Sequence, residues 1–327
     1  MTYEEAKTAF ERLFSGLMDE EEARALLIQM HERGETTDEI AAAAETMRRY
    51  SIKLPVPDDL RPKLIDNCGT GGDKSGSFNI STTVSILLAG AGCYVAKHGN
   101  RSITSKSGSA DMLEKLGVRL DLTPEKQVEM LQECGFTFIF AIHHHPAMRF
   151  VMPIRKSIPH RTIFNILGPL TNPAGVEKQF IGVFDPHFVS RIAKALKRLG
   201  SRRAMVVSSR DGLDEISLGA PTDAALLEEG NLELRTIDPL DLGIERAPLK
   251  AVAGGDAETN ARITREILSG SVTGPKRDIV LVNAAGALVV DGRAKSLEEG
   301  LAIAAETIDS GRALSALEKI VEVSNRL

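Results

Sequence analysis

A glycine-rich segment near residue 70 has the composition of an anion-binding loop. It runs Asp66-Asn-Cys-Gly-Thr-Gly-Gly-Asp73, passes Lys74, and reaches the amide and hydroxyl side chains of Asn79, Ser81 and Thr82. Clustered glycines let backbone N–H groups approach an anion, and a helix beginning near residue 80 would add its positive end. The spacing is neither that of a Walker A loop nor GxGxxG. The segment therefore indicates a phosphate site, or a tight turn with an ordinary helix cap.

A second polar segment follows the next apolar run. Lys97-His-Gly-Asn-Arg101 leads into hydroxyl-rich residues that include Lys106 and end near Ser109. Open α/β sheets bind ligands beyond the carboxyl ends of their strands, so two such loops after two strands are expected at one site. A solvated loop is the alternative interpretation.

The charges of the chain are unevenly distributed. Its formal net charge is −5, yet residues 74–110 and 134–176 contain no Asp or Glu and carry eight Lys and Arg residues. Buried or Gly/Ser-rich segments can lack acids for structural reasons alone. The distribution also fits an anion site in an otherwise acidic protein.

Two further groups could bind metal ions. The adjacent Asp214 and Glu215 suit Mg²⁺, which commonly takes one or two carboxylates together with waters and substrate phosphates. A solvated turn is the alternative for this pair. His143, His144 and His145 do not predict zinc, because neighbouring side chains project differently and no Cys or spaced carboxylate accompanies them.

Composition excludes several classes of protein. Hydrophobic residues make up 43% of the 327 residues and charged residues 26%, which indicates a folded core. The mild acidity argues against nucleic-acid binding, and no apolar stretch is long enough to span a bilayer. Three cysteines without a CxxC pattern and an acidic, non-apolar start predict a cytoplasmic protein without a signal peptide.

The pattern of elements predicts two parts. Residues 1–50 are helical: Asp19 with Glu22 and Thr36 with Glu39 form capping-box patterns, and Gly34 offers a stop. Residues 53–63 contain three prolines and are expected to be a linker. From residue 64, strand and helix patterns alternate, which is typical of a largely parallel sheet with helices on both faces.

The predicted strands and helices of this second part can be assigned to residues. Strands are expected at 64–65, 94–96, 136–142, 179–184 and 204–207, with a hairpin over 222–234. Helices are expected at 80–91, 110–116, 124–134 and 188–199, and over much of 256–327. The prediction is an α/β protein: a small α-helical domain at 1–63, joined by helices from about 160–175, and a larger α/β domain at 64–327.

Six motifs together resemble the anthranilate phosphoribosyltransferases, a family with the class III nucleoside-phosphorylase-like fold. They are GTGGD at 69–73, FNIST at 78–82, KHGNR at 97–101, SGSAD at 107–111, RTIFNILGPLTNPA at 161–174 and Asp214-Glu215. The motifs occur in the family's order. The resemblance implies transfer of the phosphoribosyl group of 5-phosphoribosyl pyrophosphate (PRPP) to anthranilate, the second step of tryptophan synthesis from chorismate, with release of pyrophosphate.

The resemblance also implies the residues that bind PRPP and its metal. The PRPP residues would be Gly69, Gly72, Asp73, Ser77, Asn79, Ser81, Thr82, Lys97, His98, Gly99, Asn100, Arg101, Ser105 and Ser109. Mg²⁺, two ions per subunit, would be held through Ser81, Asp214 and Glu215 and through the pyrophosphate.

Anthranilate would be bound by Gly69, Asn100, His145 and Arg155, with His98 near the aromatic amine. Arg155 can pair with a carboxylate in a bidentate way that Lys cannot reproduce. Residues 157–160 depart from the family's turn behind Arg155. We expect displacement at the ribose C1 through an oxocarbenium-like transition state without a catalytic base, since an aromatic amine is already neutral.

The resemblance further implies a homodimer formed through the N-terminal helices, and no nucleic-acid or membrane partner is expected. Two alternatives stay open. A pyrimidine nucleoside phosphorylase shares the fold, although its glycine and lysine motifs differ from KHGNR and SGSAD. The second alternative is a non-catalytic relative that binds nucleic acid, which would need a large basic surface. The net charge of −5 and the intact Asp214–Glu215 pair both argue against this alternative.

Overall fold

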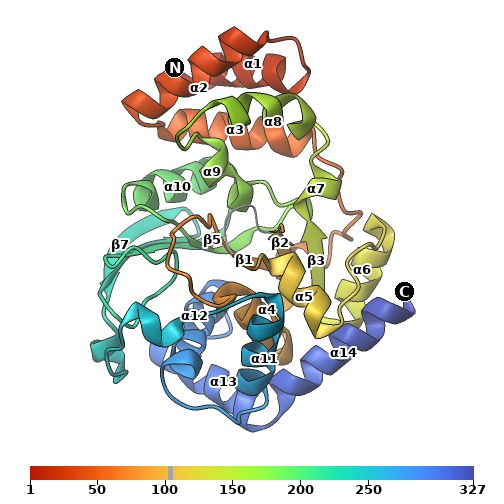
Figure 1. Ribbon diagram of the computed structural model, residues 1–327, viewed down its shortest axis with the longest axis vertical. Helices are drawn as coiled ribbons and strands as arrows, with labels where there is room; N and C mark the ends of the chain where they lie inside the picture. Colours follow the sequence, from red (N-terminus) through yellow and green to blue (C-terminus); the bar gives the residue numbers. More distant parts are fainter. Residues whose placement is uncertain (102–105) are drawn as a thin grey trace.

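The computed structural model describes residues 1–101 and 106–327, which form a helical part and an α/β part (Figure 1). The strands are β1 (Leu64–Gly69), β2 (Tyr94–Gly99), β3 (Phe136–Phe140), β4 (Lys178–Gly182), β5 (Arg203–Ser209), β6 (Thr222–Glu228) and β7 (Asn231–Ile237). The helices are α1 (Tyr3–Phe14), α2 (Glu20–Arg33), α3 (Thr37–Arg49), α4 (Ile80–Gly90), α5 (Ser109–Leu116), α6 (Pro124–Cys134), α7 (Ala141–His144), α8 (Met148–Ser157), α9 (Phe164–Leu167), α10 (His187–Arg198), α11 (Ala257–Leu268), α12 (Pro275–Asp291), α13 (Leu297–Asp309) and α14 (Arg312–Arg326).

The seven strands form one sheet in the order β3-β2-β1-β4-β5-β6-β7. Strands β1 to β5 are parallel, whereas β6 and β7 are antiparallel. The chain builds outward from β1 to β3 and then crosses to β4 on the other side of β1. Ligands of such sheets bind where the strand order reverses, which here lies between Gly69 of β1 and its register partner Gly182 of β4.

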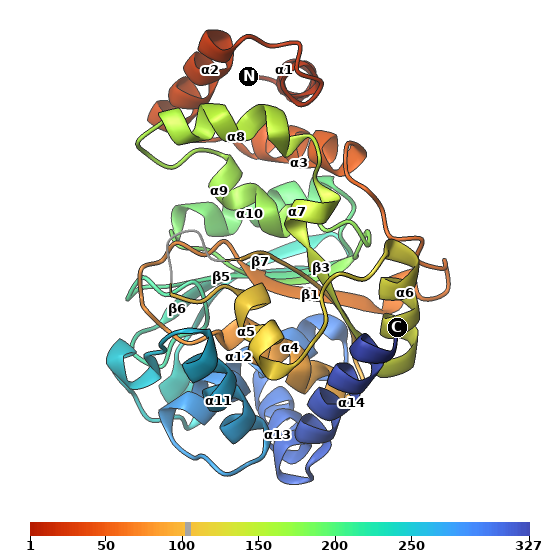
Figure 2. The same ribbon diagram turned by 45° about the vertical axis from the view of Figure 1, so that its right-hand side comes forward.

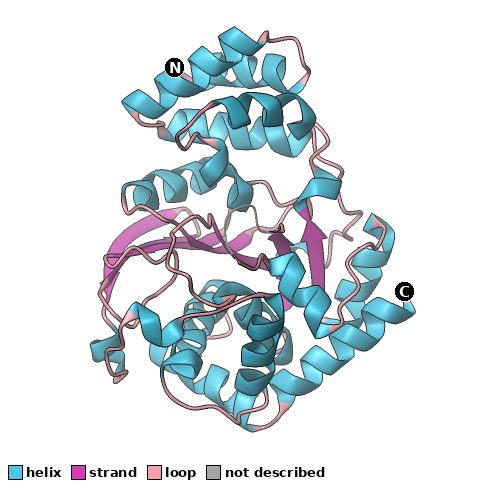
Figure 3. Ribbon diagram, viewed as in Figure 1, coloured by secondary structure: helices cyan, strands magenta, loops and turns pink. Residues whose placement is uncertain are grey.

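Helices cover both faces of the sheet, as the alternating pattern predicted. Figure 3 shows α10 on one face and α4, α11, α12 and α13 on the other. Each face has its own apolar core, and the parallel strands are buried on both sides; β3, with the sequence FTFIF, is buried at every position. Continuous burial of this kind is why parallel strands have apolar sequences without alternation.

The first 50 residues form three helices whose ends follow the predicted caps. Thr36 and Glu39 form a reciprocal capping box at α3, and Gly34 ends α2 with φ 79°. Asp19 caps α2 alone, because Glu22 forms an ion pair with Arg12 of α1 instead of bonding back.

A fourth helix packs with these three. Helix α8 lies against α1 and α2, and the short α9 contacts α3 (Figure 2). The chain therefore returns to the helical part from residue 148, earlier than the expected 160–175. The division at residues 63 and 64 stays a prediction.

Most of the other elements agree with expectation. The hairpin over 222–234 is confirmed, with Glu229 (φ 44°) and Gly230 (φ 84°) at its turn. The strand predicted for 136–142 is too long, because residues 141–144 form a helical turn, α7. No helix in the described part of the chain is long and apolar enough to cross a membrane.

Candidate active site

The carboxyl ends of the parallel strands meet the loop after β5 at very short range. A Cβ atom at Gly182 would lie 1.6 Å from the carbonyl oxygen of Asp214, and one at Gly69 would lie 2.4 Å from Asp214 Oδ2. Glycine is therefore needed at the end of β4, where the near atom is backbone, and a side chain at Gly69 would displace the Asp214 carboxylate. This close approach brings the GTGGD loop and the Asp214–Glu215 pair together.

The glycine-rich loop has a backbone that only glycine adopts readily. Gly71, Gly72 and Gly76 have φ values of 67°, 75° and 69°, and Lys74 shares this region with φ 60°. The loop is tied to the acidic pair, since the N–H of Gly71 donates to Asp214 Oδ2 at 2.8 Å. The backbone donors and the carboxylates thus belong to one structure.

The carboxylates of this site are buried and close to one another. Burial, and next the negative charge of Asp73, raise the pKa of Asp214 to about 7. Burial, and next Asp214, raise the pKa of Glu215 well above its usual range. Such crowding of acids at a strand edge is typical of functional sites, because it destabilises the protein unless a cation binds.

Lys97 provides positive charge inside this group. Its side chain is buried, and its ammonium donates to the carbonyl of Asn67 at 2.8 Å and lies 3.5 Å from Ser81 Oγ. Burial lowers its pKa, while nearby Cys68, Asp66 and Glu215 act in the opposite direction. Lys97 and Ser81, predicted for PRPP, therefore lie beside the predicted metal ligand Glu215.

The donor atoms here fit Mg²⁺. Asp214, Glu215 and Ser81 offer only hard oxygen atoms, and Asp73 Oδ2 is buried without a hydrogen-bond partner among the described residues. Among all the described residues, no group of three Asp, Glu, His or Cys side chains is arranged so that it could hold a metal ion by itself. An ion that completes its shell with waters and substrate phosphates matches this partial set.

Two histidines form a hydrogen-bonded pair on the other side of the site. His98 Nδ1 lies 3.0 Å from the carbonyl of Gly168, and His98 Nε2 lies 3.2 Å from His145 Nε2. A carbonyl only accepts, so His98 carries its proton on Nδ1, and His145 must donate from Nε2. His145 Nδ1 is then an acceptor, and it is buried without a partner among the described residues.

Burial keeps both of these rings neutral. It lowers the pKa of His98 to about 4 and, with the neighbouring His98 and His144, that of His145 to about 2. His144 faces away from the pair, since its Nδ1 lies 2.9 Å from the carbonyl of Ile52. Only His145 of the three consecutive histidines joins the candidate site.

Arg155 lies in the last turn of α8, and Arg161 lies in the segment that connects α8 to α9. Arg155 is half-buried with its guanidinium 5.7 Å from the centre of the Phe164 ring, and no carboxylate pairs with it among the described residues. Arg161 donates to the carbonyl of Gly72 and lies 3.7 Å from the Phe184 ring. Arg155 is therefore available to an anion, whereas Arg161 supports the glycine-rich loop.

The remaining predicted residues lie around these groups. Asn79 directly precedes α4, Ser77 forms an isolated bridge with Ala253, and Thr82 is buried in the first turn of α4. Ser109 Oγ donates to the carbonyl of Asn100, directly after Gly99 at the end of β2. The PRPP roles of these residues stay predictions.

Arg101 and Ser105 differ from the rest of the predicted set. The Arg101 guanidinium forms ion pairs with Asp111 at 2.9 Å and with Glu114 at 2.5 Å, so it is engaged by α5. Ser105 lies outside the described residues.

Buried asparagines that the motifs left without a role hold the site loops. Asn172 donates to Asp66 Oδ2 and to the carbonyl of Ala96, both at 2.8 Å. Asn283 of α12 accepts from the N–H of Ile216 at 2.8 Å and donates to its carbonyl at 2.9 Å, which fixes the residue after Glu215. A lone Asn in an apolar helix such as DIVLVNAAGALVV was the available signal.

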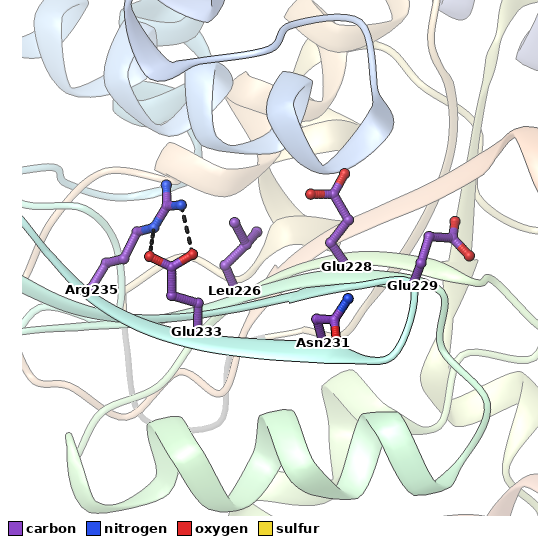
Figure 4. A pocket seen from close by; sticks show the side chains of 6 residues that line it. All are labelled: Leu226, Glu228, Glu229, Asn231, Glu233 and Arg235. Carbon is purple, nitrogen blue, oxygen red and sulfur yellow. Dashed lines mark hydrogen bonds and ion pairs between the residues drawn. The ribbon is translucent and has the colours of Figure 1, made fainter.

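A pocket of about 340 Å³ lies elsewhere, on the β6–β7 hairpin (Figure 4). It is lined by Leu226, Glu228, Glu229, Asn231, Glu233 and Arg235, and Glu233 and Arg235 pair with each other at 2.7 Å. Charged side chains on an edge strand commonly prevent edge-to-edge association. None of the predicted site residues lies there.

The chain matches two family models. Residues 1–51 match the glycosyl transferase family, helical bundle domain, and residues 61–314 match the glycosyl transferase family, a/b domain. A curated relative, the anthranilate phosphoribosyltransferase of Rubrobacter xylanophilus, is 46% identical over 99% of this chain and 93% of its own length.

Solved structures agree with this relationship. The crystal structure of anthranilate phosphoribosyltransferase from Thermus thermophilus is 42% identical, with a TM-score of 0.92 over 99% of this chain and 96% of its own. The Saccharomyces cerevisiae enzyme in complex with PRPP and Mg is 28% identical, with a TM-score of 0.89 over 100% and 94%. A second structure of the yeast enzyme contains 4-fluoroanthranilate. The chain therefore belongs to the anthranilate phosphoribosyltransferase family.

Proposed function

We propose that this protein transfers the phosphoribosyl group of PRPP to the amine of anthranilate, giving N-(5-phosphoribosyl)anthranilate and pyrophosphate. This is the second step from chorismate to tryptophan. The observation that carries the proposal is the buried Asp214–Glu215 pair held against the glycine-rich loop at the switch point of the sheet. A site of that kind suits a metal-bound pyrophosphate.

PRPP would bind along the first side of the site. The backbone N–H groups of Gly72 and Asp73, the first turn of α4 at Ser81 and the buried Lys97 would face its phosphates, whereas the N–H groups of Thr70 and Gly71 are engaged by Gly182 and Asp214. Mg²⁺, two ions per subunit, would be held by Ser81, Asp214 and Glu215 together with the pyrophosphate. When bound, it supplies positive charge that stabilises the departing pyrophosphate.

Anthranilate would bind on the second side. The unpaired guanidinium of Arg155 suits the substrate carboxylate, and Asn100 and Gly69 would line the same space. His145 Nδ1, an acceptor without a partner among the described residues, suits an N–H of the aromatic amine. Because that amine is neutral, the chain needs to position it and needs no general base.

The same proposal includes a cytoplasmic homodimer formed through the N-terminal helices. In support of it, a groove of about 260 Å³ between α1 and α2 is lined in part by Ala9, Met18 and Leu26, and the neighbouring Leu17 is 74% exposed. Light scattering on the purified protein tests this. One chain has a mass of 35.3 kDa, so twice that mass supports the dimer, and the mass of one chain contradicts it.

A fluorescence assay tests the activity. Anthranilate fluorescence should disappear only when PRPP and Mg²⁺ are both present, and consumption of anthranilate without PRPP would overturn the proposal. Thymidine and uridine with inorganic phosphate serve as the second arm. Release of free base from either would instead indicate a pyrimidine nucleoside phosphorylase.

A further inference from the structure

A segment far from the motifs pairs with the rear of the glycine-rich loop. We name it the rear segment; it comprises Val252–Gly255 between the hairpin and α11. The N–H of Phe78 donates to the carbonyl of Val252 at 3.2 Å, and the N–H of Gly254 donates to that of Gly76 at 2.9 Å. Ser77 and Ala253 form an antiparallel bridge between these bonds. Residues 76–78 of the loop are therefore paired, backbone to backbone, with the rear segment.

The two backbones approach too closely for a side chain. A Cβ atom at Gly254 would lie 2.6 Å from Phe78 Cα and 2.6 Å from Asn260 Oδ1. Real Cβ atoms do not come this near to backbone atoms, so the contact requires glycine. The rear segment thus determines where residues 76–78 lie.

Asn260 of α11 joins the rear segment to Asn79, and its orientation is forced. The N–H of Gly255 can only donate, so the amide atom 2.8 Å away is Asn260 Oδ1. Asn260 Nδ2 then donates to Asn79 Oδ1 at 2.8 Å. Asn79 Nδ2 is left facing the carbonyl of Ser107, which only accepts, at 3.2 Å.

The chain of bonds therefore links two loops that the motifs place around PRPP. Asn79 ends the glycine-rich loop, and Ser107 lies just before α5. The hydroxyl of Ser107 also donates to Asn79 Oδ1, at 3.1 Å. Asn260 is 2% exposed and Asn79 is half-buried, so water does not readily replace these bonds.

We propose that Asn260 is a positioning residue for PRPP: with the rear segment, it orients the Asn79 amide and so holds both loops in the arrangement that receives the phosphates. The proposal rests on the proposed function for the identity of the ligand. The positioning of Asn79 by Asn260 depends only on contacts within the protein.

The same helix offers a matched control. Thr264 lies one turn after Asn260, is fully buried, and its hydroxyl is 2.8 Å from that of Thr83 in α4. Thr264→Val therefore removes a buried polar contact between α11 and α4, and it leaves the hydrogen bonds from Asn260 to Gly255 and to the Asn79 side chain in place. Asn260→Leu removes the two bonds to Gly255 and Asn79 and keeps the number and branching of the side-chain heavy atoms.

The experiment is calorimetric titration of PRPP with Mg²⁺ into the full-length protein and the two variants. We expect Asn260→Leu to raise the Kd for PRPP about tenfold, because the one buried hydrogen bond that orients Asn79 is lost. In steady-state kinetics, its KM for anthranilate should stay within about twofold of the wild-type value. Thr264→Val should lower the melting temperature but leave the Kd unchanged. Equal Kd values for the wild type and a folded Asn260→Leu protein, or equal weakening in both variants, would overturn the proposal.

Hydrogen exchange separates this outcome from failure of the proposed function. If the wild type does not bind PRPP, the proposed function fails, but the positioning is still measurable without ligand. Amide exchange at residues 76–79 and 252–255 should accelerate in Asn260→Leu and not in Thr264→Val. Unchanged exchange in Asn260→Leu, or in Asn260→Ala if the first variant does not fold, would overturn the inference.

Discussion

The two sides of the site differ in how they treat charge. The phosphate side, which we define as Gly69–Ser81, Lys97, Asp214 and Glu215, collects buried carboxylates around a lysine. The aryl side, defined as His98, His145 and Arg155, holds two rings that burial keeps neutral and one guanidinium. We expect the first side to bind cations and phosphates, and the second to bind a flat molecule with one carboxylate and an uncharged amine.

The sides also differ in what positions their groups. On the phosphate side, glycines allow backbone to touch carboxylate, as at Gly69 and Asp214. On the aryl side, a hydrogen-bond chain from the carbonyl of Gly168 through His98 sets the tautomer of His145. We therefore expect the first side to be sensitive to volume and charge, and the second to hydrogen-bond donors and acceptors.

Removing the carboxylates should have the largest effect. Asp214→Asn combined with Glu215→Gln keeps the volumes but loses both negative charges, so we expect kcat to fall about 10²- to 10³-fold. Rates measured over a range of Mg²⁺ concentrations check this, and the melting temperature should not fall, since buried repulsion is removed. Wild-type turnover in the double variant would contradict the role of the pair.

Adding a single methyl group at Gly182 should lower kcat almost as much. The Cβ of Gly182→Ala would lie 1.6 Å from the carbonyl of Asp214, so the loop must shift, and a misplacement of about 1 Å can cost roughly 10²-fold in rate. Gly90→Ala is the control, because its Cβ would meet the carbonyl of Arg312 at 2.9 Å, away from the site. It should lose stability and keep kcat. Equal losses of kcat in both variants would mean that any crowded glycine lowers the rate, wherever it lies, and would contradict a specific role for Gly182.

Arg155→Ala should act on the aryl side alone. Loss of a charge-assisted pair to a carboxylate predicts a KM for anthranilate about 10- to 100-fold higher, with the KM for PRPP almost unchanged. Arg155→Lys should recover only part of the affinity, because an ammonium cannot form the bidentate pair. Steady-state kinetics with each substrate varied in turn measures both values; a parallel rise in both would contradict the division.

The last prediction concerns stability and its pH dependence, not the rate. The pKa values of His98 and His145 are lowered to about 4 and about 2, whereas the unfolded chain has histidines near 6.5. Below pH 6.5 the unfolded state takes up protons that the native rings do not, so stability is complete above 6.5 and falls toward pH 4. Each histidine contributes about 1.4 kcal/mol per pH unit in that range.

His145→Gln should therefore reduce the slope. Glutamine keeps a donor for His98 Nε2 but does not titrate, so the loss of unfolding free energy between pH 6.5 and 4.5 should be smaller than in the wild type. Urea unfolding at several pH values measures it. Identical slopes would show that His145 is protonated as readily in the folded protein as in the unfolded chain.

The sequence predicted local features of both sides well. The ends of the strands that precede the glycine-rich loop and the Asp214-Glu215 pair can be predicted from neighbouring residues alone, because a buried parallel strand and a glycine turn each have a typical residue pattern. The contact of Gly71 with Asp214 joins residues 143 apart, and it became predictable only through the resemblance. Without the resemblance, the periodicity of apolar residues does not determine the order of the parallel strands in the sheet.

Other parts could not be predicted because they depend on long-range partners. The motif suggested PRPP for Arg101, and that role stays a prediction; the ion pairs of Arg101 with Asp111 and Glu114 depend on how α5 packs. The tautomer of His145 depends on Gly168, which contacts His98 from 70 residues away. Asn260 and Asn283 appear in the sequence only as polar residues in buried helices, and their targets follow from packing.

Calorimetric titration of PRPP with Mg²⁺ into two variants tests the division of the site most directly. We predict that Arg155→Ala binds PRPP with the Kd of the wild type, whereas the Asp214→Asn, Glu215→Gln protein binds it at least about tenfold more weakly. Wild-type affinity in the carboxylate variant, or equal weakening in both, would contradict the account.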